Sequence, residues 1–310
     1  MGSFPIVYHV GPFTLTAYGI GLALTFLFAY WYLSWRLERR GLPQQWLVSG
    51  VWWVIVASVV GARAASVASN WASYRARPWS AVDFWHGGWA GLSSFGGLAV
   101  AVPVALWLVH RRAPEAATVQ VLDVGVPVLT AGWALGRAIA CQFMVNAGGP
   151  VTTAWYGLAY SGQAGRRVPV PLFQSVEDWA IFALLLGLER WRDRRRGPVG
   201  LVAAAGVALW GLTRASDEWL FFLRSGHGGA IATALAGLAF FAGGVAAFLW
   251  LLQRRRLPVS ITACPGASPP GPAAVAPGMG ATAPEVCGSV LIGTHLGYLP
   301  NHDGGSNAND

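Results

Sequence analysis

The feature that most constrains this chain is a series of long apolar segments, separated by short stretches that are rich in arginine. A helix needs about 20 apolar residues to cross a hydrocarbon core of roughly 30 Å. Only helices and closed barrels satisfy every backbone hydrogen bond inside a bilayer. We therefore predict an all-α integral membrane protein with seven transmembrane helices, at Phe13–Trp35, Trp46–Ser69, Trp89–Val109, Thr118–Cys141, Pro171–Leu188, Pro198–Leu220 and Ala230–Leu252.

The composition excludes an ordinary soluble domain. Hydrophobic residues make up 55% of the 310 residues and charged residues only 11%, whereas soluble domains carry about a quarter charged residues. The net charge of +8 could indicate a nucleic-acid partner. The arginines lie between apolar segments and not on one polar face, however, so we expect no nucleic acid. The three cysteines have neither zinc nor CxxC spacing, and we expect no metal and no cofactor.

The arginines also predict the orientation of the helices, because cytoplasmic loops carry an excess of Lys and Arg. Thirteen arginines follow the first, third, fifth and seventh segments, and five lie in the opposite loops. The N-terminus is therefore expected outside and the C-terminus in the cytoplasm. The first segment lacks the basic region and cleavage site of a signal peptide, so we expect it to remain as a helix.

The chain is expected to have two parts. Residues 1–256 contain all the apolar segments and form the transmembrane domain. Residues 257–310 are rich in Pro, Gly and Ala and have no periodic apolar face, which is typical of a disordered segment. We therefore predict a disordered cytoplasmic tail.

Arg137 stands within the fourth apolar segment, shortly before a break at Gly148-Gly149-Pro150. An arginine at the bilayer centre costs on the order of 3 kcal/mol and nearly always faces a bundle interior or an aqueous cavity. With a rise of about 1.5 Å per helical residue, Arg63 and Arg214 lie at about the same outer level. Glu218, one turn after Arg214, can pair with it. Further polar or small residues are expected in the same outer half, namely Tyr18, Ser93, Ser94, Gly96, Gly97, Gln174 and Glu177.

Two interpretations of this outer cluster are open. The charged residues can pair with one another and hold the helices together as a polar network. Alternatively, the arginines form an anion site that opens to the outer leaflet, because a planar guanidinium donates two parallel hydrogen bonds to a phosphate. Charges inside a membrane usually mark a functional site, and a phosphate with an apolar remainder is a phospholipid headgroup. Asp123, near the cytoplasmic end of its helix, lies outside the cluster.

Short motifs accompany these residues along the chain. They are Tyr18-Gly19, Gly61-Ala62-Arg63, residues 91–98 (Gly-Leu-Ser-Ser-Phe-Gly-Gly-Leu), Asp123, Gly136-Arg137, Gln174-x-x-Glu177 and Arg214-x-x-x-Glu218. In their order, spacing and topology they resemble the prolipoprotein diacylglyceryl transferase family of the bacterial cytoplasmic membrane. The resemblance covers residues 1–256 and not the tail, and it implies a multi-pass protein of the bacterial inner membrane.

The resemblance implies a transferase with two substrates. Enzymes of the family move the diacylglyceryl group of phosphatidylglycerol onto the thiol of a lipobox cysteine in the signal peptide of a prolipoprotein, and glycerol phosphate leaves. By this resemblance Arg137 and Arg214 hold the phosphate, Glu218 orients Arg214, and Tyr18 belongs to the catalytic set. The implied substrate-binding residues are Arg63, Ser93, Ser94, Gly96, Gly97, Asn146, Gln174 and Glu177.

The sequence departs from the family pattern in two places. Phe95 stands where the family has a histidine before Gly-Gly, and the family run Gly-Arg-x-Gly-Asn-x-x-Asn-Gly-Glu is not intact after Arg137. We favour an active transferase that uses another base, such as Tyr18 or Glu218. The alternatives are a relative without turnover that binds anionic phospholipid, and a small-solute transporter. The sequence has no internal repeat of the kind that transporters often show.

Overall fold

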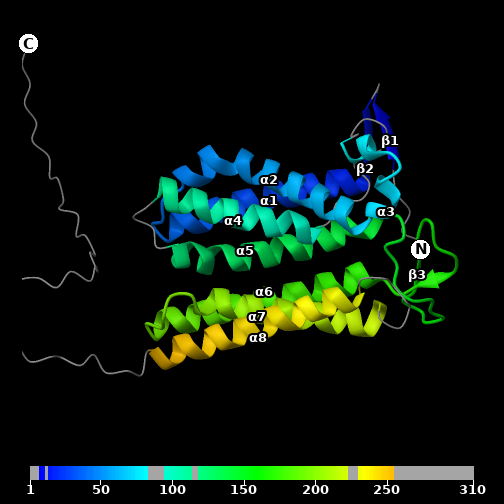
Figure 1. Cartoon of the computed structure of the whole chain (residues 1–310). Coiled ribbons are helices and arrows are strands. Elements are labelled where there is room, and N and C mark those ends of the chain that lie inside the picture. Colours follow the sequence, from blue (N-terminus) through cyan, green and yellow to red (C-terminus); the bar gives the residue numbers. More distant parts are fainter. Residues whose placement is uncertain (1–6, 11–12, 83–93, 114–117, 223–229, 255–310) are drawn as a thin grey trace, which may run out of the picture. The chain divides into compact units, whose positions relative to one another are not determined.

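The computed structural model describes residues 7–10, 13–82, 94–113, 118–222 and 230–254. Its long helices, drawn in Figure 1, are α1 (Ala17–Arg39), α2 (Gln45–Ser69), α4 (Ser94–Arg112), α5 (Thr118–Ile139), α6 (Val170–Arg194), α7 (Leu201–Asp217) and α8 (Ala230–Arg254). The shorter turns are α3 (Trp71–Tyr74), η1 (Pro78–Ala81) and η2 (Cys141–Phe143), and the π-helical segment η3 (Glu218–Phe222) continues α7. The predicted tail at 257–310 lies outside the described residues.

Five of the described helices are long and apolar enough to cross a membrane. They are α1, α2, α5 together with η2, α6 and α8. The helices α4 and α7 are shorter, with 19 and 17 residues, and are not among the five. Large apolar side chains remain exposed on the outside of these helices, for example Trp52 and Trp53 on α2. Such surface is expected where lipid rather than water surrounds a helix.

The helices pack lengthwise, α2 along α4, α7 along α8, and α5 against α1, α6 and α7. Glycines set how closely two of these pairs approach. A Cβ atom on Gly61 of α2 would lie 2.4 Å from the carbonyl oxygen of Gly96 on α4. A Cβ atom on Gly237 of α8 would lie 2.8 Å from the backbone nitrogen of Ala215 on α7. Small residues permit this close approach of the two backbones. In a membrane, where no hydrophobic force acts between helices, such close packing drives their association.

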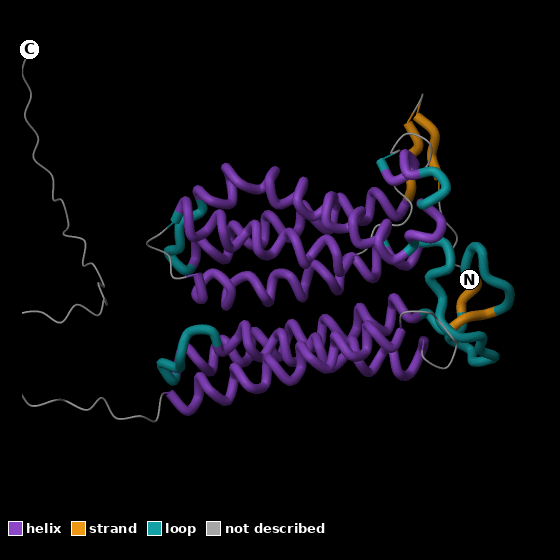
Figure 2. The backbone as a smooth tube through the Cα atoms, in the orientation of Figure 1, coloured by secondary structure: helices purple, strands orange, loops and turns teal. Residues whose placement is uncertain are grey.

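Two short hairpins lie at one end of the helices (Figure 2) and were not predicted. Strand β1 (Val7–Val10) pairs antiparallel with β2 (Phe13–Thr16), and β3 (Leu158–Ala159) pairs with β4 (Arg166–Arg167). The first hairpin corrects the predicted start of the first helix. Thr16 is the N-cap of α1, and its hydroxyl oxygen accepts a hydrogen bond from the backbone nitrogen of Gly19 at 3.1 Å. The helix therefore begins at Ala17 and not at Phe13, because the cap and the alternating Phe-Thr-Leu-Thr sequence favour a strand before it.

Candidate functional site

Arg137 lies in the last turn of α5 and is half-buried. Its guanidinium carbon is 5.3 Å from the centroid of the Trp133 ring, a cation–π contact that leaves the N–H donors uncommitted. Within the described residues it makes no hydrogen bond and no ion pair. A guanidinium with five free donors in a membrane-spanning helix is suited to an anionic ligand.

Arg214 of α7 is held by a carboxylate that the sequence analysis did not identify. Its Nη2 atom donates to Oδ2 of Asp217, one turn further along α7. The Nε2 atom of Gln174 on α6 donates to the same oxygen at 3.0 Å. All three side chains are buried, with exposed fractions of 5% or less. A spacing of three residues is as suitable for an ion pair as the spacing of four that suggested Glu218, so the sequence contained this signal.

A hydrogen bond joins α5 and α6 close to Arg137. The hydroxyl of Ser175 donates to the carbonyl oxygen of Ala134 at 2.8 Å, and both groups are buried, three residues before Arg137 and one residue after Gln174. The guanidinium groups of Arg137 and Arg214 interact electrostatically with each other. Glu177 of α6 and Glu218 of η3 also interact with Arg214, and Asp178 of α6 interacts with both arginines. Arg137 also acts on Tyr18 of α1.

Arg63, the third predicted arginine, is buried against a different segment. Its Nε atom donates to the carbonyl oxygen of Ala81 at 2.7 Å, and its Nη2 atom donates to the carbonyl oxygen of Ser80 at 2.7 Å. Its guanidinium carbon also lies 5.5 Å from the centroid of the Tyr74 ring. These contacts fix the turn η1 beside the end of α2. A role of Arg63 in phosphate binding therefore stays a prediction.

The glycines of the predicted headgroup turn lie between two helices. Gly96 is packed against Gly61 and Ala65 of α2, and a Cβ atom on Gly97 would lie 3.1 Å from the hydroxyl of Ser58. Both positions are explained by close packing of α2 and α4. Ser93 lies outside the described residues, and the side chains of Ser94 and Phe95 are not described, so their roles also stay predictions.

Asn146 lies in the loop between α5 and α6, where it is exposed and has a positive φ of 60°. Its backbone nitrogen donates to the carbonyl oxygen of Ser161 at 3.0 Å. The loop is ordered by buried polar contacts, since the hydroxyl of Tyr160 donates to Oε1 of Gln142 at 2.9 Å. Burial raises the pKa of the Tyr160 hydroxyl, and this hydrogen bond only partly opposes the rise. No contact in the described part of the chain joins Asn146 to Arg137.

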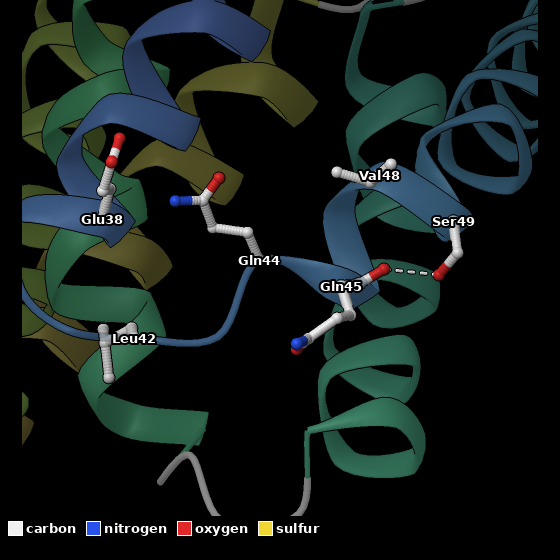
Figure 3. Close-up of a pocket in the computed structure, with 6 residues that line it drawn as sticks. All are labelled: Glu38, Leu42, Gln44, Gln45, Val48 and Ser49. Carbon is white, nitrogen blue, oxygen red and sulfur yellow. Dashed lines mark hydrogen bonds between the residues drawn. The ribbon is translucent and has the colours of Figure 1, made fainter. Parts of the chain in front are cut away.

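A pocket of about 630 Å³ among the described residues is remote from the two arginines. It lies where α1 connects to α2 and is lined by Glu38, Leu42, Gln44, Gln45, Val48 and Ser49 (Figure 3). It is at the opposite end of α1 from Tyr18. The six lining residues include a carboxylate and no cation, so this pocket is unsuited to a phosphate. Arg137 and Arg214 therefore form the candidate functional site.

Comparison with known proteins settles the family. The sequence model of prolipoprotein diacylglyceryl transferase matches residues 5–250. The chain belongs to the prolipoprotein diacylglyceryl transferase family. It is therefore a transferase of lipoprotein biosynthesis, and its apolar helices make it a multi-pass membrane protein.

Three relatives illustrate the similarity, each named a phosphatidylglycerol–prolipoprotein diacylglyceryl transferase. The protein of Parasynechococcus marenigrum is 30% identical over 282 residues, which cover 83% of this chain and 97% of the relative. The protein of Nitratidesulfovibrio vulgaris is 29% identical, covering 70% of this chain and 80% of the relative. The protein of Pseudoalteromonas atlantica is 26% identical, covering 82% of this chain and 91% of the relative.

Proposed function

We propose that this protein transfers the diacylglyceryl group of phosphatidylglycerol to the lipobox cysteine of a prolipoprotein, with the lipid phosphate bound between Arg137 and Arg214. The observation that carries this proposal is the convergence of two guanidinium groups from α5 and α7, of which Arg137 has no hydrogen-bond partner within the described residues. Asp217 holds Arg214 in a fixed orientation, and Gln174 in turn donates to Asp217. A preorganised pair of donors of this kind binds a phosphodiester without reorganising during the reaction.

The chemistry of the transfer suits these two arginines. The cysteine sulfur attacks the glycerol carbon that carries the phosphate, a C–S bond forms, and the C–O bond to the phosphate breaks. The leaving glycerol phosphate gains one negative charge as this bond breaks. Guanidinium groups in a site with little water stabilise that charge strongly, and such stabilisation is usually the largest catalytic contribution. The nucleophile comes from the prolipoprotein, so the enzyme needs no cysteine of its own.

We further propose that α4 and α7 also cross the membrane, beside α2 and α8, which gives seven spans in the bacterial cytoplasmic membrane. Each packs along a partner that is itself long and apolar enough to span. The basic residues of α4 lie in its last turn, as they do in α1 and α6. With the arginine distribution, this count supports an external N-terminus and a cytoplasmic C-terminus.

A reporter enzyme fused after Arg256 tests this topology. We expect activity from a reporter that works in the cytoplasm and none from one that works only outside. Seven spans place the C-terminus on the side of the membrane opposite to the external N-terminus. A reporter fused within the loop between α5 and α6 serves as the matched control and should give the opposite result. An external signal from the Arg256 fusion would contradict the seven-span arrangement.

The transfer itself is tested with the purified full-length protein in phosphatidylglycerol vesicles. A lipobox peptide should gain the mass of one diacylglyceryl group through a thioether bond. The matched control peptide, with serine in place of the lipobox cysteine, should gain nothing, because its hydroxyl is a far weaker nucleophile than a thiolate. A chain that binds phosphatidylglycerol but forms no thioether would support the second candidate, a lipid-binding relative without turnover, which the phenylalanine at position 95 favours.

A further inference from the structure

Asp178 of α6 is a buried carboxylate to which neither the sequence analysis nor the proposed function gives a role. Its side chain is 4% exposed, and it interacts electrostatically with both Arg137 and Arg214. Among the residues that the structure describes, no group donates a hydrogen bond to it. Buried polar groups in proteins are hydrogen-bonded in the large majority of cases. The fully enclosed side-chain atoms without a partner in the described residues belong to Trp46, Trp133 and Gln174, so the Asp178 oxygens keep some access to a group bound beside the two arginines.

Asp178 lies on the face of α6 that contacts α7. Gln174 lies one turn before it on the same face and contacts Asp217 of α7. Further along this face, Ile181 and Leu185 pack with Val202 of α7 in one apolar cluster. Residues spaced by three and four share one face of a helix. Asp178 consequently lies between α5 and α7, one turn deeper than Gln174, where a phosphate held by the two arginines would be its neighbour.

We propose that Asp178 is the proton acceptor for the lipobox thiol. This role rests on the proposed function and supplies the base that Phe95 cannot provide. The Asp178 carboxylate takes the thiol proton, the sulfur lone pair forms the C–S bond to the glycerol carbon, and the C–O bond electrons leave with the phosphate. The products are the thioether, the glycerol phosphate dianion and protonated Asp178, which then releases its proton to the departing phosphate or to water.

Three other ionisable groups of the site are less suited to this step. Asp217 is committed to Arg214 and Gln174. Glu177 is only half-buried, and the arginine that acts on it is Arg214. Tyr18 is a phenol, whose ordinary pKa of about 10 makes the neutral form a weak base.

Charge balance favours the same assignment. With all groups ionised, the two cations Arg137 and Arg214 face four carboxylates, and the bound phosphodiester adds a further negative charge. These carboxylates are those of Glu177, Asp178, Asp217 and Glu218. A proton gained by one of them lowers the repulsion within the cluster, and Asp178 interacts with both arginines.

The variant Asp178→Asn tests the role in the full-length protein, with phosphatidylglycerol vesicles and the lipobox peptide. At pH 7 we expect the transfer rate to fall on the order of 100-fold, which is typical for the loss of a general base. The rate of the variant should then rise about tenfold per pH unit toward a thiol pKa of about 8.5, because a thiol that ionises in solution needs no base. Asp178→Glu, which keeps the carboxylate, should retain a substantial part of the activity. Binding of phosphatidylglycerol should be at least as tight in Asp178→Asn as in the wild type, because the variant removes a negative charge beside the phosphate, and it should be retained in Asp178→Glu.

The control is Asp193→Asn, the same chemical change at the far end of α6, where the side chain is 40% exposed. It should transfer at the wild-type rate at every pH. If Asp178→Asn is as active as the wild type, or loses activity equally at every pH together with Asp178→Glu, the proton-acceptor role is wrong and the proposed function is untouched. A wild-type chain that yields no thioether removes the proposed function and this role with it.

Discussion

Replacing Arg214 by alanine should lower the rate of diacylglyceryl transfer by about 1,000-fold, equivalent to about 4 kcal/mol of transition-state stabilisation. Arg214 is 5% exposed and is fixed by Asp217, so its donors act on the phosphate from a water-poor position. The negative charge that develops on the leaving group would lose its most rigid partner. Initial rates of thioether formation, measured at saturating phosphatidylglycerol, give the size of the effect.

The alanine variant also leaves Asp217 as a buried carboxylate without its arginine, which destabilises a protein by about 3–5 kcal/mol. Arg214→Lys separates the two effects. Lysine keeps the charge and the pairing with Asp217 but lacks the planar fork that matches a phosphate. We expect a folded protein with a smaller but clear loss of rate. Arg190→Ala, at an exposed position of α6, is the matched control and should transfer normally. Wild-type rates from both Arg214 variants would exclude the phosphate role.

The positions of the helices could be predicted from the sequence, because the length of each apolar segment and the arginines that follow it determine where a span can lie. The ends were less predictable. The fifth segment was expected to end at Leu188, yet α6 continues to Arg194. The reason is tertiary, since both carboxylate oxygens of Glu189 accept hydrogen bonds from Nη2 of Arg36 on α1 at 2.6 Å. From the sequence alone, a polar helix end has the same pattern as a loop. It can be assigned to the helix only when its partner on another helix is known.

The sequence predicted the depth of the site residues in the membrane better than it predicted their side-chain contacts. Depth along the helices placed Arg137 and Arg214 together, and the structure brings them together. The same depth placed Arg63 with them, but local carbonyl groups at Ser80 and Ala81 occupy its donors. Depth is one coordinate, whereas the direction of a side chain around its helix depends on which neighbours pack there. Asp178 was not predicted as a site residue, because an acidic residue near a helix start has a simple explanation in the helix dipole.

The helix that carries Arg214 is anchored at its other end by Asp123 of α5, which is 2% exposed. The N-cap residue of α7 is Gly200, with φ of 95°, and it offers no side chain to cap the helix. A Cβ atom there would lie 2.9 Å from Val119, so a capping side chain has no space. Asp123 supplies the cap from another helix. Its oxygens accept from the backbone nitrogens of Gly200 at 2.7 Å and Ala203 at 2.8 Å, and from Arg192 at 2.5 Å.

Asp123→Ala should therefore lower the free energy of unfolding by about 3–5 kcal/mol, because it removes a buried ion pair and a helix cap together. The midpoint of thermal unfolding in detergent should fall by roughly 10 °C. Asp123→Asn should be intermediate, since the amide oxygen still accepts a hydrogen bond but the charge that pairs with Arg192 is gone. The transfer rate per folded molecule should stay near the wild-type value, because Asp123 is at the end of α7 opposite to Arg214.

Asp193→Asn tests whether the loss of stability depends on the burial of a carboxylate or only on the number of its ion pairs. Asp193 also contacts two arginines, Arg40 and Arg192, each at 2.7 Å, but its side chain is 40% exposed. Water screens these pairs, so the expected loss is under about 1 kcal/mol. If the Asp123 and Asp193 variants unfold at the same temperature, the cap on α7 contributes nothing and the ends of the helix are held by lipid and apolar packing alone. A large difference would instead show that one buried carboxylate, reached across from α5, sets where α7 begins and so where Arg214 comes to lie.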